Sequence, residues 1–180
     1  YLGHQVVAAL AGLGGEVETV VSLDLRPAPP ERSVGGVLQA CADIGATYVA
    51  FSPVARGFLC GQPIDGSTLP ASDLRSTMPR FLGEHLAANL RMQAAYNAIA
   101  RDVGCTPAQL AIAWLLHKAP HIIPLPGTGK VDHLLEDLGA ADVVLDSATM
   151  ARLEATVNQR TVSGPRYAAQ ATAEVDTETF

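Results

Sequence analysis

The amino-acid sequence predicts an α/β fold, in which short parallel strands alternate with helices. Three runs rich in β-branched and aliphatic residues have the length of strands, and they cover residues 17–25, 47–52 and 121–125. Each run adjoins a stretch whose apolar residues recur with helical periodicity. The chain has 180 residues, of which 48% are hydrophobic and 17% charged, so it is long and apolar enough to bury a core.

The first two strands each follow a predicted helix that glycine ends. Val6, Val7 and Leu10 give the first helix an apolar face, and Gly14 with Gly15 stops it. Gly45 stops the second helix, whose apolar face comprises Val37, Leu38, Ala40, Cys41 and Ile44. A polar loop rich in proline then covers residues 62–81, and long loops of this kind are usually lids or binding loops.

The second half predicts three more helices around the last strand. One helix ends at Gly104, and Thr106 to Gln109 forms a capping box that begins the next, nearly all-apolar helix. The strand at 121–125 leads through a glycine-rich turn into a helix that carries leucines on one side: Leu134, Leu135 and Leu138. Asp146 is predicted to cap the final helix.

Charge and cysteine content exclude several classes of function. The net charge is −6 and there is no basic run, which disfavours nucleic acid and anionic membranes as partners. No apolar run is long enough to span a membrane. The cysteines are three in number and far apart, which indicates reduced thiols and a cytoplasmic protein. His117 and His121 are separated by Pro120 on a helix that should already have ended, so we expect no metal site.

The turn after the last predicted strand has the chemistry of a phosphate site. A strand that turns directly into a helix presents unpaired N–H groups and the positive end of the helix dipole. Thr128 adds a hydroxyl and Lys130 a cation at the same place. The loop after the second strand is comparable, because Ser52 offers a hydroxyl and Arg56 a guanidinium that suits a diphosphate.

The motifs in these segments resemble the aldo-keto reductase family over residues 34–167. The resemblance rests on ACADIGATYVAFSPVARGFLCG at 40–61, LPASDLRSTMPRFLGEHLAANL at 69–90, TPAQLAIAWLL at 106–116, PLPGTGK at 124–130 and VSGPRY at 162–167. It implies a partial (β/α)₈ (TIM-type) barrel, namely its C-terminal half, preceded by a short helix–strand piece. It also implies a nicotinamide cofactor, NADP, with NAD possible.

The resemblance further implies which residues contact that cofactor. Family members place the first loop along the pyrophosphate, which here means Ser52, Pro53, Val54 and Arg56. They hold the 2′-phosphate at the second turn and the adenine on the helix that follows it, at positions corresponding to Gly127, Thr128, Lys130, Glu136 and Asp137. The family commonly has Gly-Thr-Lys-Arg and Glu-Asn, where this chain has Gly-Thr-Gly-Lys and Glu-Asp. These departures remove a cation and an amide, so we expect a weakened preference for NADP.

The first 32 residues allow two interpretations, and we treat 1–32 and 33–180 as separate segments. Residues 1–32 resemble a fragment of an epimerase-type short-chain dehydrogenase, with Gly3 and Asp24 at about the spacing of a dinucleotide-binding unit. Alternatively, VVSLDLR at 20–26 resembles the sixth strand of an aldo-keto reductase barrel, with Val21 in place of a tyrosine. The chain begins at Tyr1 in mid-pattern, so we expect it to be truncated.

Two functions remain open at this stage. The first is an NADP-dependent oxidoreductase that reduces a small carbonyl substrate to an alcohol, of which this chain supplies the cofactor-binding half. No residue matches the family's catalytic tetrad, so we assign no catalytic residue and expect the chain alone to be inactive. The second is a non-catalytic half-barrel that binds a nucleotide or a partner. Three strands cannot close a barrel, so self-association through an open sheet edge is expected in either case.

Overall fold

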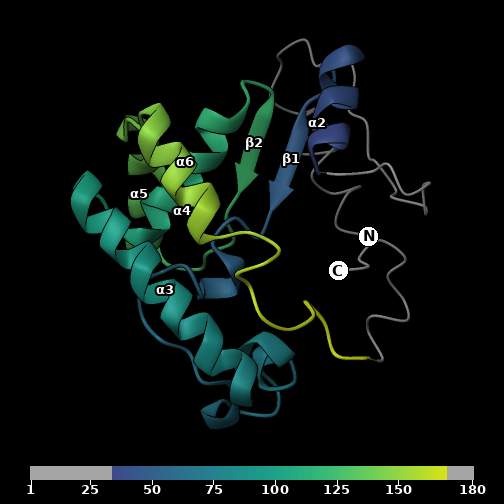
Figure 1. The fold of residues 1–180 in the computed structure, drawn as a ribbon, viewed down its shortest axis with the longest axis vertical. Coiled ribbons are helices and arrows are strands. Elements are labelled where there is room, and N and C mark those ends of the chain that lie inside the picture. Colours follow the sequence, from purple (N-terminus) through teal and green to yellow (C-terminus); the bar gives the residue numbers. More distant parts are fainter. Residues whose placement is uncertain (1–33, 170–180) are drawn as a thin grey trace.

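A computed structural model describes residues 34–169 of the chain (Figure 1). The helices in this part are α2 (Val34–Asp43), α3 (Gly83–Val103), α4 (Pro107–Lys118), α5 (Val131–Leu138) and α6 (Ser147–Thr156), and the strands are β1 (Tyr48–Phe51) and β2 (Ile122–Leu125). Short 3₁₀ turns occupy the connection from β1 to α3. The strand predicted at 17–25, and the rest of the segment 1–32, lie outside the described residues.

The two strands pair in parallel, as the sequence predicts. Tyr48 aligns with Ile122 and Phe51 aligns with Leu125, so the carboxyl ends of both strands meet at one edge. The sheet formed by the described residues is two-stranded and open. Figure 1 shows α3 to α6 gathered on one side of the strands.

The two faces of this sheet differ in burial. Ala50 and Ile122 point to the helices and are buried. The alternate residues lie on the opposite face and are exposed: Val49, Phe51, Ile123 and Leu125. Because side chains alternate along a strand, this face is apolar along both strands. The described part of the chain therefore leaves one apolar face of its sheet uncovered.

The main core lies between helices rather than on the sheet. Tyr96, Ile99 and Ala100 of α3 pack with α4, Leu145 and Leu153, and they are almost completely buried. Leu110 and Ala113 of α4 have no exposed surface, which confirms that the apolar helix is largely buried. A second, smaller cluster lies under the loop that follows β1 and comprises Phe58, Met78, Phe81 and Leu86.

The helix boundaries confirm the capping residues and the helix-ending glycine that the sequence predicts. Thr106 and Gln109 form the predicted reciprocal capping box at the start of α4. Asp146 caps α6 through the N–H of Thr149, at 2.7 Å. Gly104 ends α3 in the left-handed conformation that glycine adopts without a steric cost.

Candidate functional site

Two loops leave the same edge of the parallel pair. The residues that end β1 and β2 are aligned neighbours, and loop 1 (residues 52–61) and loop 2 (residues 126–130) begin directly after them. Binding sites in α/β proteins form at the carboxyl ends of the strands, from the loops that follow them. The structure thus brings the two predicted phosphate loops to one side of the molecule.

Loop 1 has an unusual backbone. Ser52, Ala55 and Arg56 have φ angles of 52°, 51° and 57°, in the left-handed region. Residues other than glycine adopt this backbone region at a cost of about 1–2 kcal/mol each. Five N–H groups of the loop, those of Ala55 and of residues 57–60, donate to carbonyls within the loop. Strain of this kind persists only where the surroundings fix it, and it concentrates at functional sites.

Buried amide side chains of α3 help to hold the backbone of loop 1 in this conformation. Gln93 is 3% exposed, and its Nε2 donates to the carbonyl of Phe58 and, at 3.2 Å, to that of Gln62. Asn97, one turn later, donates to the carbonyl of Gly61 at 3.1 Å. These two side chains are spaced i and i+4, so they lie on one face of the helix. They bind the backbone carbonyls of Phe58, Gly61 and Gln62 and so hold loop 1 against α3.

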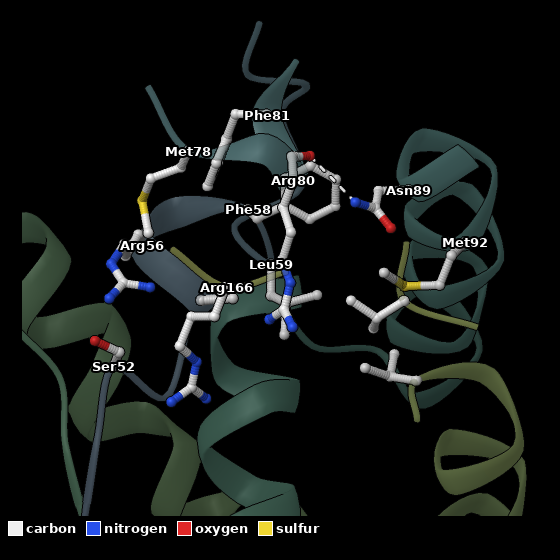
Figure 2. A pocket seen from close by; sticks show the side chains of 13 residues that line it. Ser52, Arg56, Phe58, Leu59, Met78, Arg80, Phe81, Asn89, Met92 and Arg166 are labelled. Atoms are coloured by element: carbon white, nitrogen blue, oxygen red, sulfur yellow. Dashed lines mark hydrogen bonds between the residues drawn. The ribbon is translucent and has the colours of Figure 1, made fainter. Parts of the chain in front are cut away.

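A small cavity of about 160 Å³ opens beside loop 1 (Figure 2). Ser52 and Arg56 line it, as do Arg80 and Arg166 from distant parts of the sequence. Among the described residues that line it, none is acidic. Guanidinium groups donate in a fork that matches phosphate oxygens. A larger hollow of about 410 Å³ lies at the end of α6, but none of the predicted site residues lines it.

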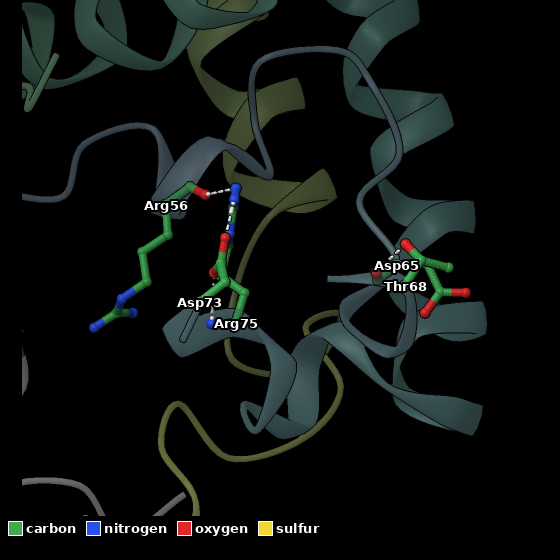
Figure 3. A network of polar contacts seen from close by, with 5 residues as sticks. All are labelled: Arg56, Asp65, Thr68, Asp73 and Arg75. Atoms are coloured by element: carbon green, nitrogen blue, oxygen red, sulfur yellow. Dashed lines mark hydrogen bonds and ion pairs between the residues drawn. The ribbon is translucent and has the colours of Figure 1, made fainter. Parts of the chain in front are cut away.

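An ion pair in the proline-rich loop at 62–81, here called the covering loop, supports the backbone of Arg56 (Figure 3). Arg75 binds Asp73 through two side-chain contacts, of 2.9 and 2.7 Å, and donates to the carbonyl of Arg56 at 3.3 Å. The hydrogen bonds from the Arg75 side chain and N–H lower the pKa of Asp73 to about 2. Asp73 is thereby engaged by Arg75, and the carbonyl of Arg56 has a partner.

Loop 2 is more open than loop 1. Gly127, Thr128 and Lys130 are exposed, and the Thr128 hydroxyl accepts the N–H of Lys130 at 3.1 Å. Lys130 is the N-cap residue of α5, so its cation lies at the helix N-terminus, as predicted. The leucines of α5 remain exposed on its outer side, at 47% for Leu134 and more than 60% for Leu135 and Leu138.

The carboxylates of α5 connect the two loops electrostatically. Burial, followed by the charges of Glu136 and Asp137, raises the pKa of the Cys60 thiol in loop 1. Burial and Glu136 raise the pKa of Asp137 itself. Gln109 of α4 also donates to the carbonyl of Glu136 at 3.1 Å. The charges of this acidic pair therefore act on the Cys60 thiol at the end of loop 1.

Not all site residues were evident from the sequence. Ser52, Pro53, Val54 and Arg56 lie together in loop 1, whereas Gly127, Thr128 and Lys130 form the separate exposed turn. No role was predicted for Arg80 or Arg166, or for the amides of α3. The spacing of Asn89, Gln93 and Asn97, four residues apart on a helix, was the signal available for the amides.

The histidines that the sequence spaces four apart have structural partners. His117 Nδ1 lies 2.9 Å from the carbonyl of Ala113, and its Nε2 accepts the N–H of Leu145 at 3.2 Å. His121 lies 3.0 Å from the carbonyl of Leu38. Within residues 34–169, no cluster of three or more potential metal ligands occurs, and no helix has both the length and the apolar character to cross a membrane.

Comparison with known proteins shows the family of this chain. The model of the Aldo/keto reductase family matches residues 19–158, which is most of the chain. The chain belongs to the aldo/keto reductase family. It is 36% identical over 137 residues to "Aldo-keto reductase yakc [NADP(+)]" of Schizosaccharomyces pombe, covering 76% of this chain and 40% of the relative. The chain thus spans about 40% of the length of that relative.

One solved structure agrees with this chain at the level of the fold. The glycerol dehydrogenase AKR11B4 from Gluconobacter oxydans superposes with a TM-score of 0.59 at 22% identity, covering 79% of this chain and 40% of that chain. A thermostable aldo-keto reductase, Tm1743, matches with a TM-score of 0.46 at 28% identity, over 68% and 34% of the two chains. The family is one of α/β barrels, and the described sheet is a part that does not close.

The comparisons bear on the two interpretations of the N-terminal segment. The family match begins at residue 19, so it includes residues 19–25 of the strand predicted at 17–25. This favours the interpretation of that strand as part of an aldo/keto reductase. The resemblance of residues 1–32 to a short-chain dehydrogenase is unsupported.

Proposed function

We propose that this chain is the C-terminal, cofactor-binding part of an NADP-dependent oxidoreductase that reduces carbonyl compounds to alcohols. The observation that carries the proposal is the meeting of loop 1 and loop 2 at the carboxyl edge of β1 and β2, with an arginine-lined cavity beside loop 1. Membership of the aldo/keto reductase family and the name of the yeast relative support the choice of cofactor.

The residues present fit a dinucleotide. A cavity of about 160 Å³ is smaller than typical sites for whole ligands, so it suits one part of the cofactor, the diphosphate. Ser52, Pro53, Val54 and Arg56 would bind that part. Gly127, Thr128 and Lys130 would hold the 2′-phosphate, because Lys130 places a cation at the N-terminus of α5. When bound, the nicotinamide supplies a hydride.

The acidic pair of α5 is expected to reduce the preference for NADP over NAD. Glu136 and Asp137 correspond to the family positions at the adenine, and Asp137 lacks the amide donor common there. Loop 2 carries one cation where the family commonly has two. Both differences weaken attraction for the 2′-phosphate, so we expect the affinities for NADPH and NADH to lie within about tenfold of each other, a difference of about 1.4 kcal/mol.

Turnover requires groups that the matched segments do not supply. Reduction of a carbonyl needs a proton donor of suitable acidity beside the hydride acceptor. No residue of this chain matches the family's tetrad, so we expect no reduction of a simple aldehyde by this polypeptide alone. Measurable NADPH-dependent reduction would contradict that expectation and would show that the chain has its own proton donor.

A second candidate function is a non-catalytic half-barrel that binds a nucleotide or a partner chain. The observation in its favour is the uncovered sheet face, on which Val49, Phe51, Ile123 and Leu125 are exposed. Self-association through this part of the sheet would cover them. Sedimentation over a range of concentrations distinguishes a dimer from a monomer, and turnover by a chain completed with the remainder of a barrel distinguishes the first function from the second.

Titration of the chain with NADPH, followed by fluorescence, tests the proposed cofactor directly. Lys130 is exposed, so Lys130→Ala should leave the fold intact while weakening NADPH about tenfold, the effect of losing one charge-assisted contact of about 1.5 kcal/mol. Lys118→Ala, at the end of α4, is the matched control and should bind NADPH normally. Absence of NADPH binding by the parent chain would refute the proposal.

A further inference from the structure

Helices α4 and α5 lie side by side (Figure 1), and the side chain of Gln109 joins the start of one to the end of the other. Its Oε1 accepts the N–H of Thr106 at 3.1 Å, which completes the capping box of α4. Its Nε2 donates to the carbonyl of Glu136 at 3.1 Å, in the last turn of α5. The last four carbonyls of an α-helix have no partner within that helix, so this second hydrogen bond caps α5.

Residue 139, directly after α5, is a glycine at the place where this amide approaches. A Cβ at Gly139 would lie 2.6 Å from Nε2 of Gln109, closer than Cβ atoms come to other heavy atoms in proteins. Gly139 has φ of −62°, which any residue adopts, so the backbone conformation does not require glycine here. The constraint on position 139 is therefore the close approach of the Gln109 amide.

Packing does little to hold α5 in the part of the chain that the structure describes. None of the residues of α5 is buried, and Leu134, Leu135 and Leu138 are exposed. Helices in proteins owe most of their stability to the packing of an apolar face, and one as short as α5 is not stable by itself. Ala140, just after the helix, has no exposed surface. The described structure thus holds α5 at its C-terminal end, where Gln109 binds.

We propose that Gln109 is a positioning residue of the nucleotide site, because it caps and fixes the helix that carries Lys130 at its N-terminus and Glu136 with Asp137 in its last turn. The inference rests on the proposed function, which assigns those three residues to the cofactor. Gln109 acts through α5 and not by touching the cofactor. A helix that is already in place binds a nucleotide without the cost of being ordered by it.

Gln109→Met and Thr106→Ala form a matched pair that tests this role on the intact chain. Each removes one half of the capping box of α4, so each should lower the thermal unfolding midpoint by a similar amount. Only Gln109→Met also removes the donor to Glu136. It should weaken NADPH about three- to tenfold, because the ligand must then order the helix that the lost hydrogen bond held. Thr106→Ala should leave the affinity for NADPH unchanged.

Further measurements locate the effect in α5. Adenosine 2′-monophosphate, whose phosphate would bind loop 2, should weaken together with NADPH in Gln109→Met, whereas inorganic pyrophosphate, expected at loop 1, should bind unchanged. Amide hydrogen exchange in α5 should become faster in Gln109→Met and stay unchanged in Thr106→Ala. Gly139→Ala displaces the same amide from the side of α5 and should reproduce the loss of NADPH affinity.

A purely structural role for Gln109 predicts a different pattern. Gln109→Met and Thr106→Ala would then lose NADPH affinity equally, in step with the unfolding midpoint, and that result would overturn the inference. An equal loss of pyrophosphate affinity in Gln109→Met would also overturn it, because the effect would not be confined to α5.

Failure of the inference and failure of the proposed function give different results. If NADPH binds to the parent chain and is weakened by Lys130→Ala but not by Gln109→Met, Gln109 has no positioning role and the nucleotide site stands. If neither NADPH nor adenosine 2′-monophosphate binds the parent chain, the proposed function is wrong, and the role of Gln109 falls with it.

Discussion

Loop 1 and loop 2 begin side by side at the same sheet edge but are built in opposite ways. Loop 1 contains three left-handed residues that are not glycine, bonds most of its own N–H groups and rests on a cluster of buried aromatic and aliphatic side chains. Loop 2 is exposed, and Gly127 and Gly129 have open space around the position of a side chain. One loop is held by its surroundings, whereas the other is determined by its own short sequence.

Under the proposed function, the two loops would bind the two ends of a long, flexible ligand in different ways. A preformed loop binds one end without paying for its own ordering. An open turn at a helix N-terminus can hold the other end through a hydroxyl, a cation and the helix dipole. Discrimination between NADP and NAD would then depend on loop 2, where a few exposed residues can change without disturbing the core.

The largest expected effect comes from removing the brace of loop 1. Gln93→Ala removes the donor to the buried carbonyl of Phe58 and to the carbonyl of the exposed Gln62, and an unsatisfied buried group costs about 1–3 kcal/mol. We expect a loss of about 1–3 kcal/mol in the free energy of unfolding, measured by urea denaturation. Gln39→Ala removes an exposed glutamine whose hydrogen bond within the described residues is to Asp43 on its own helix, and it should change the free energy of unfolding little. Equal losses in the two variants would show that loop 1 does not depend on α3.

Releasing the backbone strain of loop 1 should stabilise the chain. Ala55 has φ of 51°, in the left-handed region. Because glycine adopts this region without steric cost, Ala55→Gly should raise the free energy of unfolding by about 1 kcal/mol. Ala71→Gly is the matched control in the covering loop, at an exposed residue without positive φ, and it should be neutral or slightly destabilising. A destabilised Ala55→Gly variant would show that the side chain contributes more than the strain costs.

These effects also show where the sequence was sufficient. Glycines, Thr106 and Asp146 act within one turn of chain, so the helices, their caps and both described strands could be predicted from local pattern. The motif of loop 1 placed Ser52 and Arg56 in one loop for the same reason, and their contact with a cofactor stays a prediction. The location of both loops at one edge followed from parallel pairing, which helix-covered strands in an α/β chain require.

Contacts between distant segments could not be predicted in that way. Arg166 reaches the cavity only because Asn89 and Arg80 hold residues 163 and 164, more than seventy residues away. The left-handed conformation of Ser52, Ala55 and Arg56 has no local signal, since none of them is glycine. The exposure of the leucines of α5 was also unforeseen, because helical periodicity indicates an apolar face but not what covers it.

The ion pair behind Arg56 predicts a pH dependence confined to acid conditions. Asp73 has a pKa of about 2 in the folded chain and an ordinary value of 3.8, so the stability it contributes is present above about pH 4 and is lost as the pH falls towards 2. The difference in unfolding midpoint between the parent chain and Asp73→Asn should therefore shrink across this window. The difference in unfolding midpoint between the parent chain and Arg75→Gln should shrink over the same pH range. A difference that persists at pH 2 would mean that the charge of Asp73 is not what stabilises the loop.

The smallest effect is expected in loop 2, and it tests the comparison most directly. Gly129 has no positive φ and nothing within 4 Å of an added Cβ, so Gly129→Ala should leave the free energy of unfolding within about 0.5 kcal/mol of the parent value. Gly57→Ala in loop 1 is the matched substitution, at φ of 87° and with Ile64 3.3 Å from the added carbon, and it should cost about 1–2 kcal/mol. Similar losses at both sites would mean that loop 2 is as constrained as loop 1. The tolerance of loop 2 to substitution would then not explain why a change in cofactor preference should arise in that loop.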